Sequence, residues 1–162
     1  MNGNLARYSG IGLAILFVLI QFVPVDRSNP TVTGVVDAPE EVMLTLRRSC
    51  WDCHSNETEW PRYARVAPVS WRLSQHVSRG REHLNFTEWD GYDLADLDEA
   101  YEEIGKEMES EGMPLGDYLL IHREAVLSRT DRQRLIAWAE AARESLPERP
   151  LEDELPAEAV RP

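Results

Sequence analysis

The run Cys50-Trp51-Asp52-Cys53-His54 constrains this chain more than any other feature of its sequence. The chain has only two cysteines, three residues apart, and a histidine directly follows the second. Two thiols at this spacing can reach both vinyl groups on one edge of a porphyrin, and the adjoining imidazole can then swing under the ring to the iron. The pattern therefore predicts one covalently attached c-type haem (haem c), with Cys50 and Cys53 as thioether links and His54 as the proximal iron ligand.

Three other interpretations of the two cysteines stay open. A redox dithiol suits an oxidising compartment, but it normally lies between a strand and a helix, and no strand is evident here. A zinc site needs four ligands, and only Cys50, Cys53, His54 and one distant histidine are on offer. The third alternative is a purely structural pair. Haem attachment is the interpretation that the adjoining histidine favours.

Residues 1–25 form an apolar N-terminal segment whose charged residues are limited to Arg7. Its apolar stretch is about 17 residues long, just enough to cross a hydrocarbon core. No small-residue cleavage site precedes Asp26, so an uncleaved transmembrane anchor is predicted in preference to a removable signal peptide. Arg7 lies on the N-terminal side of that stretch, which predicts a single-pass protein of the cytoplasmic membrane with its main domain on the periplasmic, extracytoplasmic side.

The rest of the chain divides by composition. Residues 26–36 contain Pro30 and Gly34, show no helical period and are predicted to be a linker. Residues 37–144 form the predicted haem domain. Residues 145–162 are acidic and rich in proline, which predicts a disordered tail.

Every strong hydrophobic period in the domain is helical, so the predicted fold class is all-α, with about four helices behind a single N-terminal transmembrane helix. Ser128 and Asp131 resemble a capping box at the start of the last helix. The apolar stripes consist of Val42, Met43 and Leu46; Val69, Leu73, His76, Val77 and Gly80; Leu94, Leu97, Tyr101, Ile104 and Met108; and Leu135, Trp138, Ala139 and Ala142.

The charge balance excludes some partners. The chain has 17 Lys and Arg against 29 Asp and Glu, a net charge of −12. Such a chain is not expected to bind nucleic acid, and its average charge also argues against adhesion to anionic lipid through a basic patch. An acidic surface favours a basic redox partner with charge-steered association, although solubility alone would also explain the acidity.

One axial position of the iron remains open once His54 is bound. Met113 is the favoured sixth ligand, because Gly112 and Pro114 flank it in an extended segment that can present a thioether. His83 is the rival, and an open position is the third possibility. The other candidates are predicted to be core or surface residues: Met43, Met108, His76 and His122.

Haem propionates need hydrogen-bond donors. The nearby side chains that could contact the haem or its propionates are Trp60, Arg62, Tyr63, Arg65 and Trp71, with core packing as the alternative for the two tryptophans. The second N–H of His54 is expected to donate to a backbone carbonyl of the loop 60–68.

Several motifs together resemble the haem-binding domain family, whose members are short, exported, monohaem c-type proteins similar to class I cytochromes c. These motifs span Cys50–Pro61, Ala67–Trp71, Gly80–Trp89 and Met113–Leu115, with Tyr118 and His122. The resemblance covers about residues 39–142. It implies a small cytochrome-c-like helical fold around one haem, His54 as proximal ligand, Met113 as distal ligand, and a membrane anchor at the N-terminus.

The predicted function is that of a membrane-anchored electron carrier, not an enzyme, in which the iron holds one electron and the protein supplies ligands, a dry crevice and a docking surface. A haem-based sensor with a labile sixth position is the alternative. A small peroxidase-like enzyme would need a distal acid–base group, for which His83 or His76 could serve.

Overall fold

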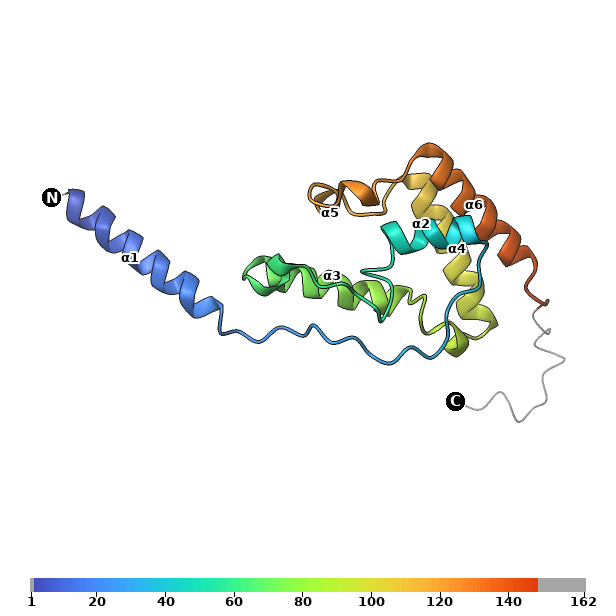
Figure 1. The fold of residues 1–162 in the computed structure, drawn as a ribbon, viewed down its shortest axis with the longest axis horizontal. Helices are drawn as coiled ribbons and strands as arrows, with labels where there is room; N and C mark the ends of the chain where they lie inside the picture. Colours follow the sequence, from blue (N-terminus) through green and yellow to red (C-terminus); the bar gives the residue numbers. More distant parts are fainter. Residues whose placement is uncertain (1, 149–162) are drawn as a thin grey trace. The chain divides into compact units, whose positions relative to one another are not determined.

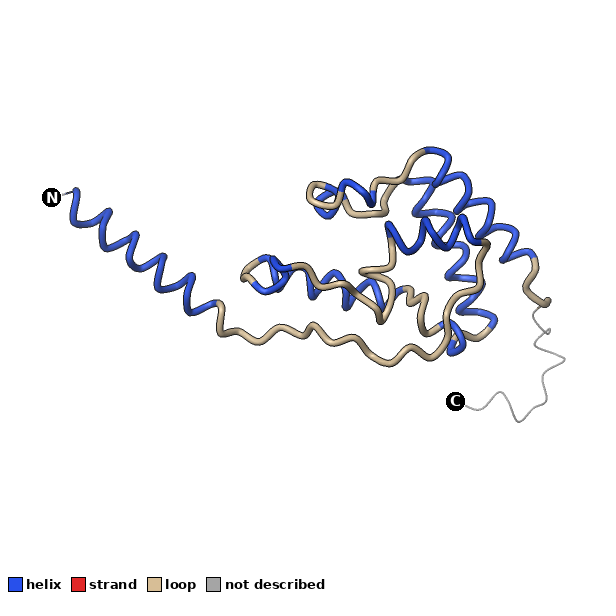
Figure 2. The backbone as a smooth tube through the Cα atoms, in the orientation of Figure 1, coloured by secondary structure: helices blue, strands red, loops and turns tan. Residues whose placement is uncertain are grey.

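The computed structural model describes residues 2–148, with side chains from Arg7 onward. The described part contains no strand, and its only bridge of strand type is an isolated parallel one between Gly34 and Glu88 (Figure 2). The all-α prediction is confirmed for this part of the chain. Its helices and 3-10 turns are α1 (Asn2–Ile20), α2 (Glu40–Ser49), η1 (Arg62–Arg65), α3 (Val69–His83), η2 (Trp89–Gly91), α4 (Leu94–Ser110), α5 (Gly116–Leu119), η3 (Arg123–Ala125) and α6 (Arg129–Glu144) (Figure 1).

The four helices predicted from apolar stripes are α2, α3, α4 and α6, and local sequence signals explain where two of them begin. The predicted capping box of α6 is present, since the Ser128 side chain accepts from the Asp131 backbone N–H and the Asp131 carboxylate accepts from Ser128 N. An equivalent box opens α4, where Asp93 and Asp96 exchange the same pair of hydrogen bonds. Each box satisfies N–H groups that lack partners within the helix.

The chain forms two compact units, each described by itself. Residues 2–36 and 50–89 form the first, here called the motif unit because it holds Cys50–His54. Residues 37–49 and 90–148 form the second, here called the helical unit.

In the helical unit, α4 and α6 lie side by side, and α2 packs against α6 (Figure 1). Tyr101 and Trp138 meet edge to face, with ring centroids 5.6 Å apart. Burying each large apolar side chain stabilises the unit by roughly 1.5–3 kcal/mol. The buried residues include Val42, Leu46, Ile104, Met108, Leu127 and Leu135, which places Met108 in the core as predicted.

In the motif unit, residues 33–36 of the predicted linker pair with a distant segment of the backbone. Val36 is buried, and its N–H donates to the Phe86 carbonyl at 2.9 Å. Thr33 and Gly34 both donate their N–H groups to the Thr87 carbonyl. Backbone pairing, which composition does not reveal, therefore fixes this segment along residues 86–88.

The N-terminal helix α1 is shorter than the predicted apolar segment, which extends to Val25. It ends at Ile20, and Pro24, which has no N–H and disfavours helix at the preceding residue, follows after one turn. Helices in residues 2–148 all fall short of the length and apolarity that spanning a bilayer requires. At the other end of the chain, all but residues 145–148 of the predicted disordered tail lies outside the described residues.

Candidate cofactor site

The two cysteines and the histidine of the motif come together in one tight turn. Cys53 N and His54 N both donate to the Cys50 carbonyl, at 3.2 and 3.0 Å. Neither cysteine is in a disulfide, and both are half-buried. The turn therefore presents two reactive sulfur atoms and one imidazole from five consecutive residues.

The imidazole of His54 is oriented by the end of α3. Its Nδ1 lies 3.0 Å from the carbonyl oxygen of Leu84, the C-cap residue directly after α3. A carbonyl oxygen can only accept, so Nδ1 carries the proton and Nε2 keeps the lone pair with which a neutral imidazole binds metal. Burial lowers the pKa of His54, which favours this neutral form.

The source of that carbonyl corrects a prediction. The loop 60–68 was expected to supply it. The structure brings in Leu84 instead, because residues 84–88 return past the motif: Phe86 N donates to the His54 carbonyl at 2.8 Å.

Phe86 is the centre of the aromatic packing around the motif. Its ring is 1% exposed and stacks on Trp51 with centroids 5.8 Å apart. It also stacks on Trp89 at 6.2 Å and lies 6.1 Å from the His54 ring. A rigid aromatic contact therefore supports the side of the histidine ring that faces Phe86.

A buried polar network joins the segment after the motif to the segment after α3. Asn85 Nδ2 donates to Asn56 Oδ1 at 2.9 Å, and Thr87 Oγ1 accepts from Asn56 N at 2.7 Å while donating to Asn85 Oδ1 at 2.8 Å. Asn56 Nδ2 completes the network by donating to the Thr31 carbonyl and the Glu88 carboxylate. These residues are missed by reasoning from sequence, which offers no local pattern for a network between distant segments.

Arg81 fastens three segments of the motif unit together. Its Nε donates to the Ser55 carbonyl at 2.7 Å, and its Nη2 donates to Thr58 Oγ1 at 2.8 Å. Its other donors reach the Ser28 carbonyl and Asn29 Oδ1, each at 3.0 Å. Burial lowers the pKa of this guanidinium, which nonetheless stays charged. A planar fork with several donors is suited to this role.

Gly80 lets α3 approach the motif closely. A Cβ at this position would lie 2.5 Å from the Cys53 carbonyl oxygen and 3.1 Å from its carbonyl carbon. Only a residue without a side chain fits at that separation.

The predicted propionate donors fall into two groups. Trp60 is half-buried, and its indole Nε1 is fully buried with no hydrogen-bond partner among residues 2–148. Arg62 and Arg65 are exposed on η1, Tyr63 between them is half-buried, and Trp71 is exposed on α3. A buried indole N–H without a partner fits an acceptor from a bound group, since leaving it unpaired is costly.

The predicted sixth ligand, Met113, is half-buried in the helical unit, between α4 and α5, and its carbonyl accepts from Arg132 Nη1 at 3.0 Å. Its rival His83 is exposed at the last residue of α3. His122 stacks on Tyr118 at 4.1 Å and pairs with the Glu124 carboxylate at 3.0 Å. Met113 as iron ligand stays a prediction.

The chain matches the model of the haem-binding domain family over residues 15–141 and belongs to this family. The matched range contains the motif unit from Ile15 onward, with Cys50–His54, Arg81 and Phe86. No curated protein and no solved structure matches the chain.

The residues present fit a haem. The donor set combines two cysteines that form no disulfide with an imidazole whose Nε2 keeps its lone pair. The Trp60 indole N–H lacks a partner, as expected of a group that meets a propionate. The zinc alternative needs four ligands, and within the described residues no group of three or more His, Cys, Asp and Glu side chains could hold a metal ion.

Proposed function

We propose that this haem protein is a monohaem c-type cytochrome that carries one electron and performs no chemistry of its own. The observation that supports this most is the five-residue turn, which brings together two cysteines outside any disulfide and an imidazole held by the Leu84 carbonyl. A second-sphere hydrogen bond of this kind fixes a ligand's tautomer and ring orientation.

Each residue has a defined part in this proposal. Cys50 and Cys53 form the thioether links, His54 Nε2 is the proximal ligand, and the Trp60 indole donates to a propionate. Met113 supplies the sixth ligand, which together with His54 would close both faces of the ring. When bound, the haem supplies a one-electron iron couple whose potential a His and Met ligand pair raises.

We further propose that the apolar N-terminal segment anchors the protein in the cytoplasmic membrane with the haem domain on the periplasmic side. Because α1 alone is not long and apolar enough to span a bilayer, the proposal includes the exposed residues Phe22 and Val23 that follow it. Arg7 lies near the start of α1, and the apolar side chains after it in the helix are exposed rather than packed in a core. Its exposed members include Ile11, Leu13, Ile15, Leu16, Phe17, Val18 and Leu19. The acidic charge of the chain supports a basic redox protein as partner.

Carbon monoxide tests the carrier assignment. The full-length haem-loaded protein is reduced, exposed to CO and followed by its absorption spectrum. If the iron is six-coordinate and closed, CO should leave the absorption spectrum unchanged. Met113→Ala should free one coordination position, so that CO rapidly shifts the main haem band. Met108→Leu, which keeps a buried apolar side chain in α4, is the matched control. A rapid shift in the unaltered protein would favour a ligand sensor or an enzyme instead.

A further inference from the structure

The motif unit contains a basic stretch that the net charge of the chain conceals. Residues 60–81 hold five arginines and no aspartate or glutamate, in a chain whose net charge is −12. Arg62 and Arg65 on η1 and Arg72 and Arg79 on α3 are exposed, whereas Arg81 is half-buried in the contacts described above. The average charge of the chain therefore does not describe this stretch.

Apolar side chains accompany these arginines at the start of α3. Val66 is 45% exposed, Val69 is 47% exposed, and Trp71 is 37% exposed. Exposed apolar residues beside arginines, with a tryptophan among them, are the composition of a surface that lies at the boundary between lipid headgroups and acyl chains.

Hydrogen bonds tie this part of the unit to the end of α1. The Gln21 amide accepts from Ala67 N at 2.9 Å and donates to the Ala67 carbonyl at 3.3 Å. Further along, Ser74 Oγ donates to the Asp26 carbonyl at 2.7 Å. The chain that leaves α1 is thus fastened to the loop before α3 and to α3 itself.

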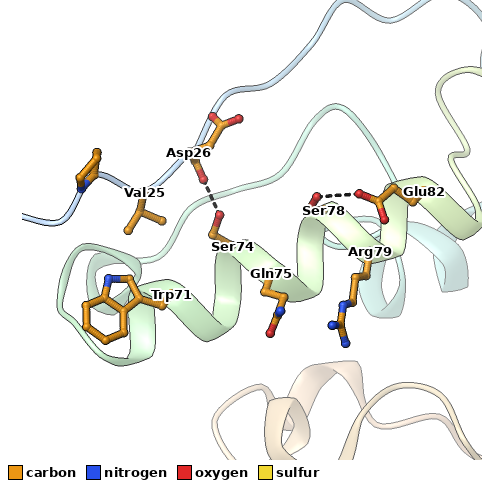
Figure 3. A pocket seen from close by; sticks show the side chains of 9 residues that line it. Val25, Asp26, Trp71, Ser74, Gln75, Ser78, Arg79 and Glu82 are labelled. Atoms are coloured by element: carbon orange, nitrogen blue, oxygen red, sulfur yellow. Dashed lines mark hydrogen bonds between the residues drawn. The ribbon is translucent and has the colours of Figure 1, made fainter.

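A shallow groove of about 470 Å³ runs between α3 and the segment that leaves α1 (Figure 3). Val25 and Trp71 lie together at one end of it, and Ser78 and Glu82 lie at the other. The apolar end of the groove therefore includes Val25, from the segment that follows α1.

We propose that Arg62, Arg65, Val66 and Val69, here called the interfacial face, rest on a membrane surface of anionic phospholipid. The arginines contact phosphate headgroups, and the two valines enter the headgroup layer. This inference rests on the proposed anchoring of α1, which brings the interfacial face to the bilayer through Gln21 and Ala67. The alternative partner of Arg62 and Arg65 is a haem propionate, and the experiment distinguishes it from a phospholipid phosphate.

Photo-crosslinking in the intact protein tests the inference. The full-length haem-loaded chain is placed in nanodiscs with and without phosphatidylglycerol, with photo-reactive benzoyl-phenylalanine in place of Val69. The same residue in place of Phe17 reports on the anchor. In place of Leu120, which is 68% exposed in the helical unit, it is the matched control. Lipid adducts are counted by mass spectrometry.

We expect more lipid adducts at position 69 than at position 120. We also expect the adducts at position 69 to increase with phosphatidylglycerol. Adducts at 17 without an excess at 69 would overturn the interfacial face and leave the anchor intact. Absence of adducts at 17 would overturn the anchor and the inference that rests on it. Adducts at 69 that do not depend on lipid charge would overturn the role given to the arginines.

Paired charge variants complete the test. Arg62→Gln with Arg65→Gln should lower the yield at position 69 about fivefold or more in anionic nanodiscs, while the haem spectrum and potential stay unchanged. Arg123→Gln with Arg129→Gln, which removes two exposed arginines of the helical unit, should leave the yield unchanged. A shifted haem potential with unchanged adducts would overturn the inference in favour of propionate binding.

Discussion

At the scale of single residues, the motif depends on side chains that lie far from it in the sequence. Leu84 orients the imidazole of His54, Phe86 supports its ring, and Arg81 holds the Ser55 carbonyl. All three come from the last turn of α3 or the segment after it. The spacing of the motif predicts the ligands, but it does not predict the residues that hold them.

Gly80→Ala should destabilise the motif unit. A Cβ would meet the Cys53 carbonyl oxygen at 2.5 Å, and overpacking of this kind costs about 1–3 kcal/mol against a helix-propensity gain of about 1 kcal/mol. The matched control is Gly105→Ala in α4, where nothing lies within 4 Å of the added atom, so a gain of up to about 1 kcal/mol is expected. Urea unfolding measures both, and equal stabilisation of the two variants would refute the close approach.

Arg81→Lys should lose most of the stabilisation that the guanidinium provides, because a lysine cannot reach four acceptors from one plane. A loss of about 2–4 kcal/mol in the free energy of unfolding is expected, since carbonyl groups lose charged donors. Arg79→Lys, an exposed position on the same helix, should change it by less than about 0.5 kcal/mol. If Arg81→Lys leaves the free energy of unfolding unchanged, the positive charge alone is enough to stabilise the unit.

At the scale of elements, the helices were predictable because their signals are local. An apolar stripe and a cap lie within one helix, so α4 and α6 follow directly from the sequence. The backbone pairing of residues 33–36 was not predicted, because its partners Phe86 and Thr87 lie about fifty residues away. The Asn56, Asn85 and Thr87 network was missed for the same reason.

Ser128→Ala tests the predicted cap of α6. The Ser128 hydroxyl accepts from Asp131 N at 3.1 Å, and removing such a cap typically costs about 1 kcal/mol. Thr130→Ala changes an exposed residue of the same first turn that takes no part in the cap, so a change below about 0.5 kcal/mol is expected. Thermal unfolding measures the stability of both variants. If the two variants are equally stable, the cap contributes nothing to the stability of α6.

At the scale of the whole molecule, the net charge of the chain describes its surface poorly, whereas the cysteine motif correctly indicates its family. A net charge of −12 concealed a stretch of 22 residues, 60–81, that carries arginines and no carboxylate. The apolar N-terminal segment was predicted to extend to Val25, whereas α1 ends at Ile20. The family assignment, by contrast, agrees with the residues quoted for it, because the match over residues 15–141 includes the cysteine motif.

Covalent attachment of the haem is the claim on which the account depends, and the mass of the unfolded protein tests it most directly. The full-length chain is produced with haem-attachment machinery, denatured in acid and weighed by mass spectrometry. We predict a mass increased by one haem, an increase that Met113→Ala retains and that Cys50→Ala with Cys53→Ala abolishes. A chain with both cysteines intact that releases its haem on unfolding, or never acquires one, would contradict the account.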